Sequence, residues 1–276
     1  MRPWFVGGIE SREKMVKAMD AYLHGDGLAQ GSPIVIAHHE VYKENIEDNV
    51  DIARFECGTA IGTFANTTPT SIWSVFHIFS NEGLLQRLRA ELSTITTSVK
   101  ADDGRTIHRI DSRQLKSATV LLSTIQEVSR YRVTGVGVRY VTADTIVGDD
   151  NDSYALKKNS WMIISNKSLH RDKEAWGEDA DEFVADRFTR KVPHAFYRTF
   201  GNGHSACCGK NFALHHIASF LALLVMRFDI QPEGGVWKEP RMDTRDSTTQ
   251  LTAPIDIPAT MIPRINPQEE VWELSE

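Results

Sequence analysis

The chain has 276 residues, of which 41% are hydrophobic, and its formal net charge is −6 at pH 7. A chain of this length and composition is able to bury a sizeable core in one or two domains. The acidic balance, and the lack of a basic stripe with interleaved aromatic residues, argue against nucleic-acid binding.

The N-terminal half of the chain is predicted to be helical. Met15, Val16 and Met19 recur at helical spacing within residues 1–48. A single long helix is predicted over 49–79, with Pro69 inside it; proline removes one N–H and clashes with the carbonyl four residues back, so we expect a kink there. Two more helices are predicted over 82–99 and 111–131.

The C-terminal half changes to short β-prone pieces, predicted over 136–141, 145–147 and 161–164. An irregular meander over 170–200 and an apolar helix over 211–228 follow. The tail carries strand-like runs around Leu251 and Met261, broken by prolines. The chain is therefore predicted to be α+β and mostly helical, with small sheets.

Residues 200–209 read Phe-Gly-Asn-Gly-His-Ser-Ala-Cys-Cys-Gly, just before the predicted helix 211–228. Glycine lets a backbone bend tightly or approach a flat ligand closely. A helix that begins just after Cys207 directs free N–H groups and the positive end of its dipole at the sulfur, which stabilises a thiolate. A thiolate held in such a loop is able to ligate haem iron from one side.

Only three cysteines occur, Cys57, Cys207 and Cys208. This odd, low count argues against a disulfide framework and for a reducing compartment. Cys57 lies among apolar residues early in the helix 49–79 and is expected to fill the core.

The loop resembles the haem-binding loop of the cytochrome P450 family, whose Phe, Gly, Cys and Gly are met here by Phe200, Gly203, Cys207 and Gly209. Three further segments resemble the same family and occur in the order in which the family has them. Residues 62–73 resemble its long distal helix, residues 127–130 its Glu-x-x-Arg motif, and residues 183–188 its Phe-x-Pro-x-Arg-Phe segment. The resemblance implies the C-terminal half of the cytochrome P450 fold.

Glu127 and Arg130 are i, i+3 neighbours on the predicted helix 111–131. An exposed ion pair of this kind contributes little to stability. The resemblance implies instead that the pair is buried beneath the haem and that Arg187 is its third member.

The resemblance also implies that Arg139, on the first β-prone piece, pairs with a haem propionate. The family's second propionate partner, two residues before the cysteine, is Ser205 here. His204, one residue earlier, is the candidate to replace it.

The distal helix departs from the commonest family pattern, because no Asp or Glu lies between Gly58 and Ser80. Its Ala-Asn-Thr-Thr-Pro sequence resembles the branch that contains sterol 7α- and 12α-hydroxylases and prostacyclin synthase. This resemblance implies that Asn66, with Thr67 or Thr68, is the distal polar residue. A proline-kinked helix with satisfied threonines also occurs in many proteins without a function.

The resemblance implies a haem-thiolate monooxygenase with haem b that oxidises a hydrophobic small molecule, such as a steroid or terpenoid of specialised (secondary) metabolism. Dioxygen and an NADPH–cytochrome reductase are the implied partners. The alternatives are an isomerase that acts on a peroxide and a truncated, non-catalytic remnant. The cytoplasmic side of the endoplasmic reticulum is the location expected for the family, although this chain has no apolar run long enough for a membrane anchor.

By this resemblance the chain is a single partial domain that lacks the family's N-terminal half. It is expected to comprise a helical lead-in (1–48), the distal and Glu-x-x-Arg helices (49–131), β pieces and meander (132–199), the cysteine loop and its helix (200–228) and a β tail (229–276).

A zinc-binding protein is a further alternative, with ligands from His194, His204, Cys207, Cys208, His215 and His216. Against it, the adjacent His215 and His216 would point about 100° apart on a helix, and the Cys-x-x-Cys pairs typical of structural zinc are missing.

Four basic residues flank the cysteine loop in sequence: Arg190, Lys191, Arg198 and Lys210. In an acidic chain, such a cluster is suited to steering an acidic redox partner to the thiolate face. Ordinary solvated charges are the alternative interpretation.

Overall fold

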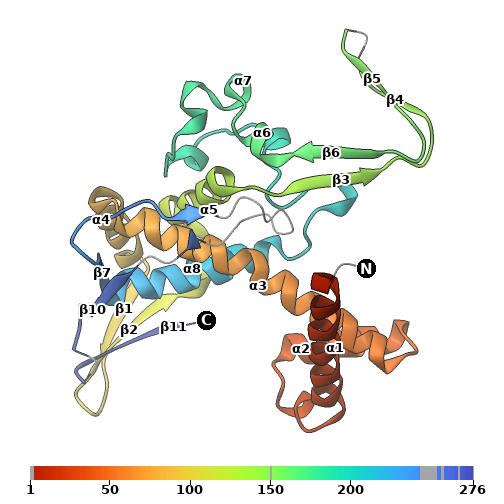
Figure 1. Cartoon of the computed structure of the whole chain (residues 1–276). Coiled ribbons are helices and arrows are strands. Elements are labelled where there is room, and N and C mark those ends of the chain that lie inside the picture. The colour runs from red at the N-terminus through yellow and green to blue at the C-terminus, as the bar shows by residue number, and fades with distance from the viewer. Residues whose placement is uncertain (1–2, 150, 243–253, 256–257, 267, 276) are drawn as a thin grey trace. The chain divides into compact units, whose positions relative to one another are not determined.

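The structure is a computed structural model that describes residues 3–149, 151–242, 254–255, 258–266 and 268–275. The chain forms two compact units, Met1–Ala65 and Asn66–Glu276. Helix α3 (Asn49–Phe79) begins in the first unit and ends in the second (Figure 1). Its bounds are those predicted from the apolar periodicity.

The first unit is helical, as predicted. It contains α1 (Pro3–His24), a 3₁₀ turn η1 (Leu28–Gln30), α2 (Pro33–Asn45) and the first part of α3. Proline is tolerated at the start of α2, where its missing N–H would have no partner within the helix. Val16 and Leu23 of α1 pack against Ile52 and Cys57 of α3, so Cys57 fills the core as expected.

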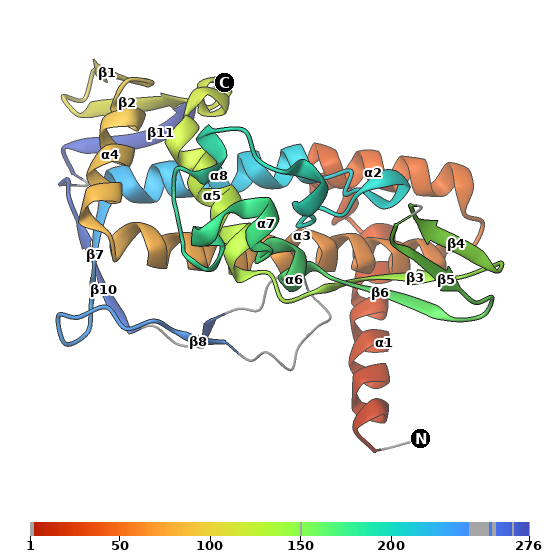
Figure 2. The ribbon, with the colours of Figure 1, turned by 90° about the horizontal axis from the view of Figure 1, so that it is seen from above.

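Three helices build the main core of the second unit: α4 (Glu82–Ser93), α5 (Thr119–Arg132) and α8 (Lys210–Arg227). Figure 2 shows them side by side. Their apolar stripes meet through fully buried leucines, among them Leu88, Leu121 and Leu221. The side chain of Asn81 begins α4, because its oxygen accepts the Leu84 N–H at 3.0 Å.

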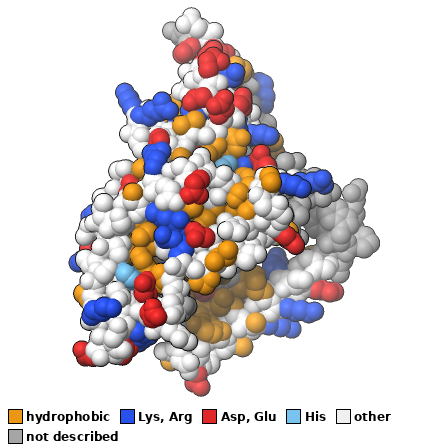
Figure 3. All heavy atoms as spheres, turned by 90° about the vertical axis from the view of Figure 1, so that its left-hand side faces the viewer, with side chains coloured by type: hydrophobic (Ala, Val, Ile, Leu, Met, Phe, Trp, Pro, Cys, Tyr) orange, Lys and Arg blue, Asp and Glu red, His pale blue; other side chains and the backbone are white. Residues whose placement is uncertain are grey.

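A three-stranded sheet adjoins this core, in the order β1 (Thr96–Lys100), β2 (Thr106–Asp111) and β11 (Glu270–Ser275). The prediction of a helix through residue 99 was wrong, since α4 ends at Ser93 and residues 96–100 form β1. Thr96, Thr97 and Val99 are β-branched, and the antiparallel partner β2 completes their backbone hydrogen bonds. On the face that carries α4 and this sheet, charged side chains of both signs lie between exposed hydrophobic ones (Figure 3).

The remaining strands form two-stranded ladders. They are β3 (Val136–Tyr140) with β6 (Trp161–Ser165), β4 (Thr145–Gly148) with β5 (Ser153–Leu156), β7 (Phe228–Pro232) with β10 (Ala259–Pro263), and β8 (Arg241–Met242) with β9 (Pro254–Ile255). The three predicted β-prone pieces are therefore strands, and Met261 lies in one. The run predicted around Leu251 lies outside the described residues.

Short helices connect these parts. Between β2 and α5 lies η2 (Ser112–Ser117), and α6 (Asn166–His170) directly follows β6. The predicted meander contains α7 (Lys173–Trp176), η3 (Glu178–Asp181), η4 (Arg187–Thr189) and η5 (His194–Phe196). The fold is mostly helical α+β, as predicted. Within the described residues, no helix is both long enough and apolar enough to cross a membrane.

Candidate functional site

The loop before α8 is closed by its own backbone. The Cys207 N–H donates to the Phe200 carbonyl at 2.8 Å. Gly201 and Gly203 have φ of 69° and 62°, in the left-handed region that favours glycine. A Cβ on Gly201 would lie 2.9 Å from the Ser205 carbonyl oxygen, so both space and conformation require glycine there.

Helix α8 begins at Lys210, three residues after Cys207. The free N–H groups of its first turn and the positive end of its dipole therefore lie near the loop. Cys207 and Cys208 are both exposed free thiols. The arrangement predicted for a thiolate ligand, a cysteine at the end of a glycine loop and before a helix, is present.

A cavity of about 330 Å³ lies against this loop. Its lining comes from α3, the β3–β6 ladder and the loop itself, and includes Asn66, Arg139, Phe200 and Cys207. Four residues predicted from widely separated segments therefore meet at one cavity.

Other predicted site residues are placed differently. Gly203, His204 and Gly209 belong to the loop but do not line the cavity, and neither do Thr67 and Thr68 of α3. Of the three distal candidates, Asn66 is thus the one at the cavity wall. The carbonyls of Asn66 and Thr67 accept the hydroxyls of Thr70 and Ser71 at 2.7 and 2.9 Å.

Asn166 and Arg198 are among the cavity residues that were not predicted to line it. Asn166, at the start of α6, is buried and lines the cavity, as does Arg198. Arg198 was assigned to the basic docking cluster because only its charge and sequence position were visible. Ser205 also lines the cavity but carries no charge. Among the described residues that line the cavity, the positively charged ones are Arg139 and Arg198.

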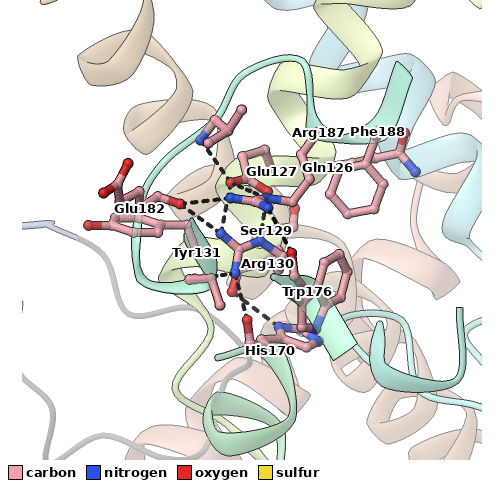
Figure 4. Close-up of polar contacts among 12 residues, drawn as sticks. Gln126, Glu127, Ser129, Arg130, Tyr131, His170, Trp176, Glu182, Arg187 and Phe188 are labelled. Carbon is pink, nitrogen blue, oxygen red and sulfur yellow. Dashed lines mark hydrogen bonds and ion pairs between the residues drawn. The ribbon is translucent and has the colours of Figure 1, made fainter. Parts of the chain in front are cut away.

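The carboxylate of Glu127 lies at the centre of a buried network (Figure 4). Its two oxygens accept from the Arg130 guanidinium, Nε at 2.7 Å and Nη2 at 2.8 Å. They also accept from Arg187 Nε at 3.1 Å and from the Val184 backbone N–H at 2.9 Å. Glu127 and Arg130 are 0% exposed, so the exposed ion-pair interpretation was wrong and the predicted contact with Arg187 is present.

Backbone carbonyls satisfy the rest of the Arg130 guanidinium. It donates to the carbonyls of His170, Ala180 and Glu182 at 2.6, 2.7 and 2.9 Å. Arg187 in turn reaches the Asp179 side chain at 2.8 Å. The network therefore ties α5 to the segments around α6, α7 and η3, and charge and hydrogen bonding are both compensated in the interior.

The zinc alternative has no geometric support. Within the part of the chain that the structure describes, His, Cys, Asp and Glu side chains do not gather in groups of three or more that could hold a metal ion.

Comparison with known proteins gives the family. The cytochrome P450 family model matches residues 44–258, which is most of the chain. The chain belongs to the cytochrome P450 family. Among relatives, the cytochrome P450 monooxygenase nodJ of Hypoxylon pulicicidum is 29% identical over 96% of this chain and 54% of its own length.

Two other relatives extend the comparison. A cytochrome P450 monooxygenase of Gibberella zeae is 31% identical over 70% of this chain and 38% of its own length. A bifunctional cytochrome P450/NADPH–P450 reductase of Bacillus cereus is 40% identical over 33% of this chain and 8% of its own length. The chain thus spans about half, or less, of the length of the relatives it matches.

Membership of the cytochrome P450 family implies a haem-iron cofactor, and the residues at the cavity fit this group. Cys207 offers a sulfur ligand at one wall. Gly137 and Gly201 also line it. Arg139 and Arg198 line it as well, and their two cations would suit the two propionates of haem b.

Proposed function

We propose that this chain forms the haem-thiolate half of a cytochrome P450 monooxygenase that oxidises a hydrophobic small molecule. The observation that carries the proposal is that Cys207 and Asn66 line the same cavity. When bound, haem supplies the iron at which dioxygen is activated. The chain supplies the thiolate from Cys207, paired cations for the propionates, and a distal amide from Asn66 that is suited to hydrogen bonding near bound dioxygen.

The supply of electrons is proposed on the same basis. An NADPH–cytochrome reductase is the proposed donor, and the bifunctional relative from Bacillus cereus, which joins both activities in one chain, supports this pairing. Arg190, Lys191 and Lys210 are exposed, so they are the residues proposed to attract an acidic partner. Arg198 is removed from this set because it lines the cavity. A location at the endoplasmic reticulum rests on the family alone.

The proposed substrate class is steroid- or terpenoid-like, as in specialised metabolism, and rests on the resemblance of residues 65–69 to the sterol hydroxylase branch. An isomerase that acts on a peroxide is the second candidate. It is favoured by one observation: an amide, Asn66, lines the cavity, and α3 has no Asp or Glu between residues 58 and 80. An isomerase would convert a peroxide substrate without a reductase, whereas a monooxygenase would need one.

The test of the thiolate assignment uses the two adjacent cysteines. The purified chain is loaded with haem, reduced and exposed to carbon monoxide, and its Soret band is recorded. Cys207→Ser should abolish the thiolate band, because only Cys207 lines the cavity. Cys208→Pro should keep the band, and Cys208→Ser is the matched control. Loss of the band in the Cys208 variants alone would refute the assignment, and absence of haem binding by the parent chain would favour the remnant.

A further inference from the structure

His170 lies at the end of α6 with its ring fully buried. Its Nδ1 is 3.1 Å from the Arg130 carbonyl oxygen, and its Nε2 is 2.8 Å from the Arg198 backbone N–H. A carbonyl only accepts and a backbone N–H only donates. The two bonds are therefore compatible with one form of the ring, the neutral tautomer that carries its proton on Nδ1.

The ring is also held in orientation. It stacks on Tyr197 with ring centres 5.6 Å apart and 21° between the planes, and meets the edge of Trp176 at 6.3 Å. The backbone carbonyl of His170 accepts from Arg130 Nη1 at 2.6 Å. Figure 4 shows His170 beside Arg130 and Trp176. Turning the ring would break both of its hydrogen bonds.

Burial keeps the ring neutral. It lowers the pKa of His170 to about 4, and the positive charges of Arg130 and Arg171 act in the same direction. A protonated ring would turn a second N–H toward the Arg198 N–H and lose that bond.

The Arg198 backbone leads directly into the cysteine loop. The next residue, Thr199, donates its hydroxyl to the Ser129 carbonyl at 3.3 Å. The residue after it, Phe200, accepts the Cys207 N–H at 2.8 Å. The segment that closes the loop is thus connected to α5 in two ways. Thr199 binds α5 directly, and the His170 ring bridges the Arg198 N–H to the Arg130 carbonyl of α5.

We propose that His170 is the positioning residue that couples the buried Glu127–Arg130 pair to the cysteine loop. Arg130 holds His170 through two bonds, since its backbone carbonyl accepts from the ring Nδ1 and its guanidinium donates to the His170 backbone carbonyl. The lone pair on Nε2 in turn holds the backbone at residue 198. This places the chain that carries Cys207 against the cavity. The inference rests on the proposed function only where it concerns the thiolate spectrum, because the backbone coupling exists without haem.

The test compares two buried histidines of the same unit. His170→Phe keeps an aromatic ring on Tyr197 but removes both nitrogens, which leaves the Arg198 N–H without its acceptor. His77→Phe is the matched control: the His77 ring is also buried and accepts from Arg132 Nε at 3.1 Å, yet contacts neither residue 198 nor the loop. Amide hydrogen exchange is measured at single-residue resolution, with the amides of the apolar part of α8 as an internal reference for global stability.

In His170→Phe, exchange at Arg198 and Cys207 should rise about tenfold or more relative to the α8 reference, because a buried donor loses its partner. In His77→Phe this ratio should not change. His170→Gln, whose side-chain oxygen is able to accept from the Arg198 N–H, should restore most of the protection and also serves if the Phe variant does not fold. Unchanged ratios in both His170 variants, or an equal rise in His77→Phe, would overturn the inference.

A second readout uses the haem-loaded chain. His170→Phe should shift the reduced, carbon monoxide-bound Soret band from the thiolate toward the thiol position, and His77→Phe should not. A thiolate band of unchanged intensity in His170→Phe would overturn the coupling to Cys207. If the parent chain binds no haem, the proposed function fails, while the exchange measurement still decides the role of His170.

Discussion

Replacing Glu127 with alanine is the sharpest test of the buried network. The substitution removes two carboxylate oxygens that accept four hydrogen bonds, three from the guanidinium groups of Arg130 and Arg187 and one from the Val184 N–H. Arg130 keeps its three carbonyl acceptors, and Arg187 keeps Asp179. The fully buried cation of Arg130 nevertheless loses its counter-charge.

The expected magnitude follows from this geometry. Removing one partner of a buried ion pair costs about 3–5 kcal/mol, because it leaves an uncompensated charge in the interior. A domain of ordinary stability has about 5–15 kcal/mol in total. Glu127→Ala should therefore lower the free energy of unfolding by a large fraction, and Glu127→Gln, which keeps the shape and one oxygen, should lower it by less.

Urea denaturation of the purified chain measures this difference, and an exposed pair of the same chemistry provides the control. Arg87 and Asp186 form two hydrogen bonds of 2.9 and 2.6 Å, but their side chains are 51% and 42% exposed. Asp186→Ala should cost at most about 1 kcal/mol. If Glu127→Ala costs no more than Asp186→Ala, the argument that burial makes the Glu127 network energetically important is refuted.

Three further predictions concern pH, docking and the distal residue. Burial lowers the pKa of His170 to about 4 and that of His77 to about 3, from the ordinary value of 6.5. As the pH falls, these histidines are therefore protonated in the unfolded chain before they are protonated in the folded one. Between pH 6.5 and 4, the titration of each should reduce the free energy of unfolding by about 3 kcal/mol. Urea denaturation across that range checks this, and a flat profile would contradict it. Charge reversal of Arg190 and Lys191 to glutamate should slow electron transfer from a flavoprotein reductase and weaken its salt dependence; stopped-flow reduction rates that do not respond would exclude the docking face. Asn66→Ala should lower product formation by about tenfold or more while the carbon monoxide spectrum stays unchanged, and a variant that turns over like the parent chain would remove Asn66 from the chemistry.

Local spacing in the sequence was sufficient for several features. The apolar periodicity of residues 49–79 predicted α3 with its observed bounds, because neighbours three and four residues apart share a helix face whatever the rest of the chain does. The same rule placed Glu127 beside Arg130. The glycines before Cys207 predicted a tight loop, since their positive φ values are a local property.

Tertiary structure alone decided the contacts between distant segments. Residues 96–99 extended a predicted helix but form strand β1, because β2 completes their hydrogen bonds. Arg198 was visible in the sequence only as a surface charge, yet the path of the meander places it at the cavity. His170 was not predicted as a site residue, since its role depends on two backbone groups, at residues 130 and 198, that only the folded chain brings to its two ring nitrogens.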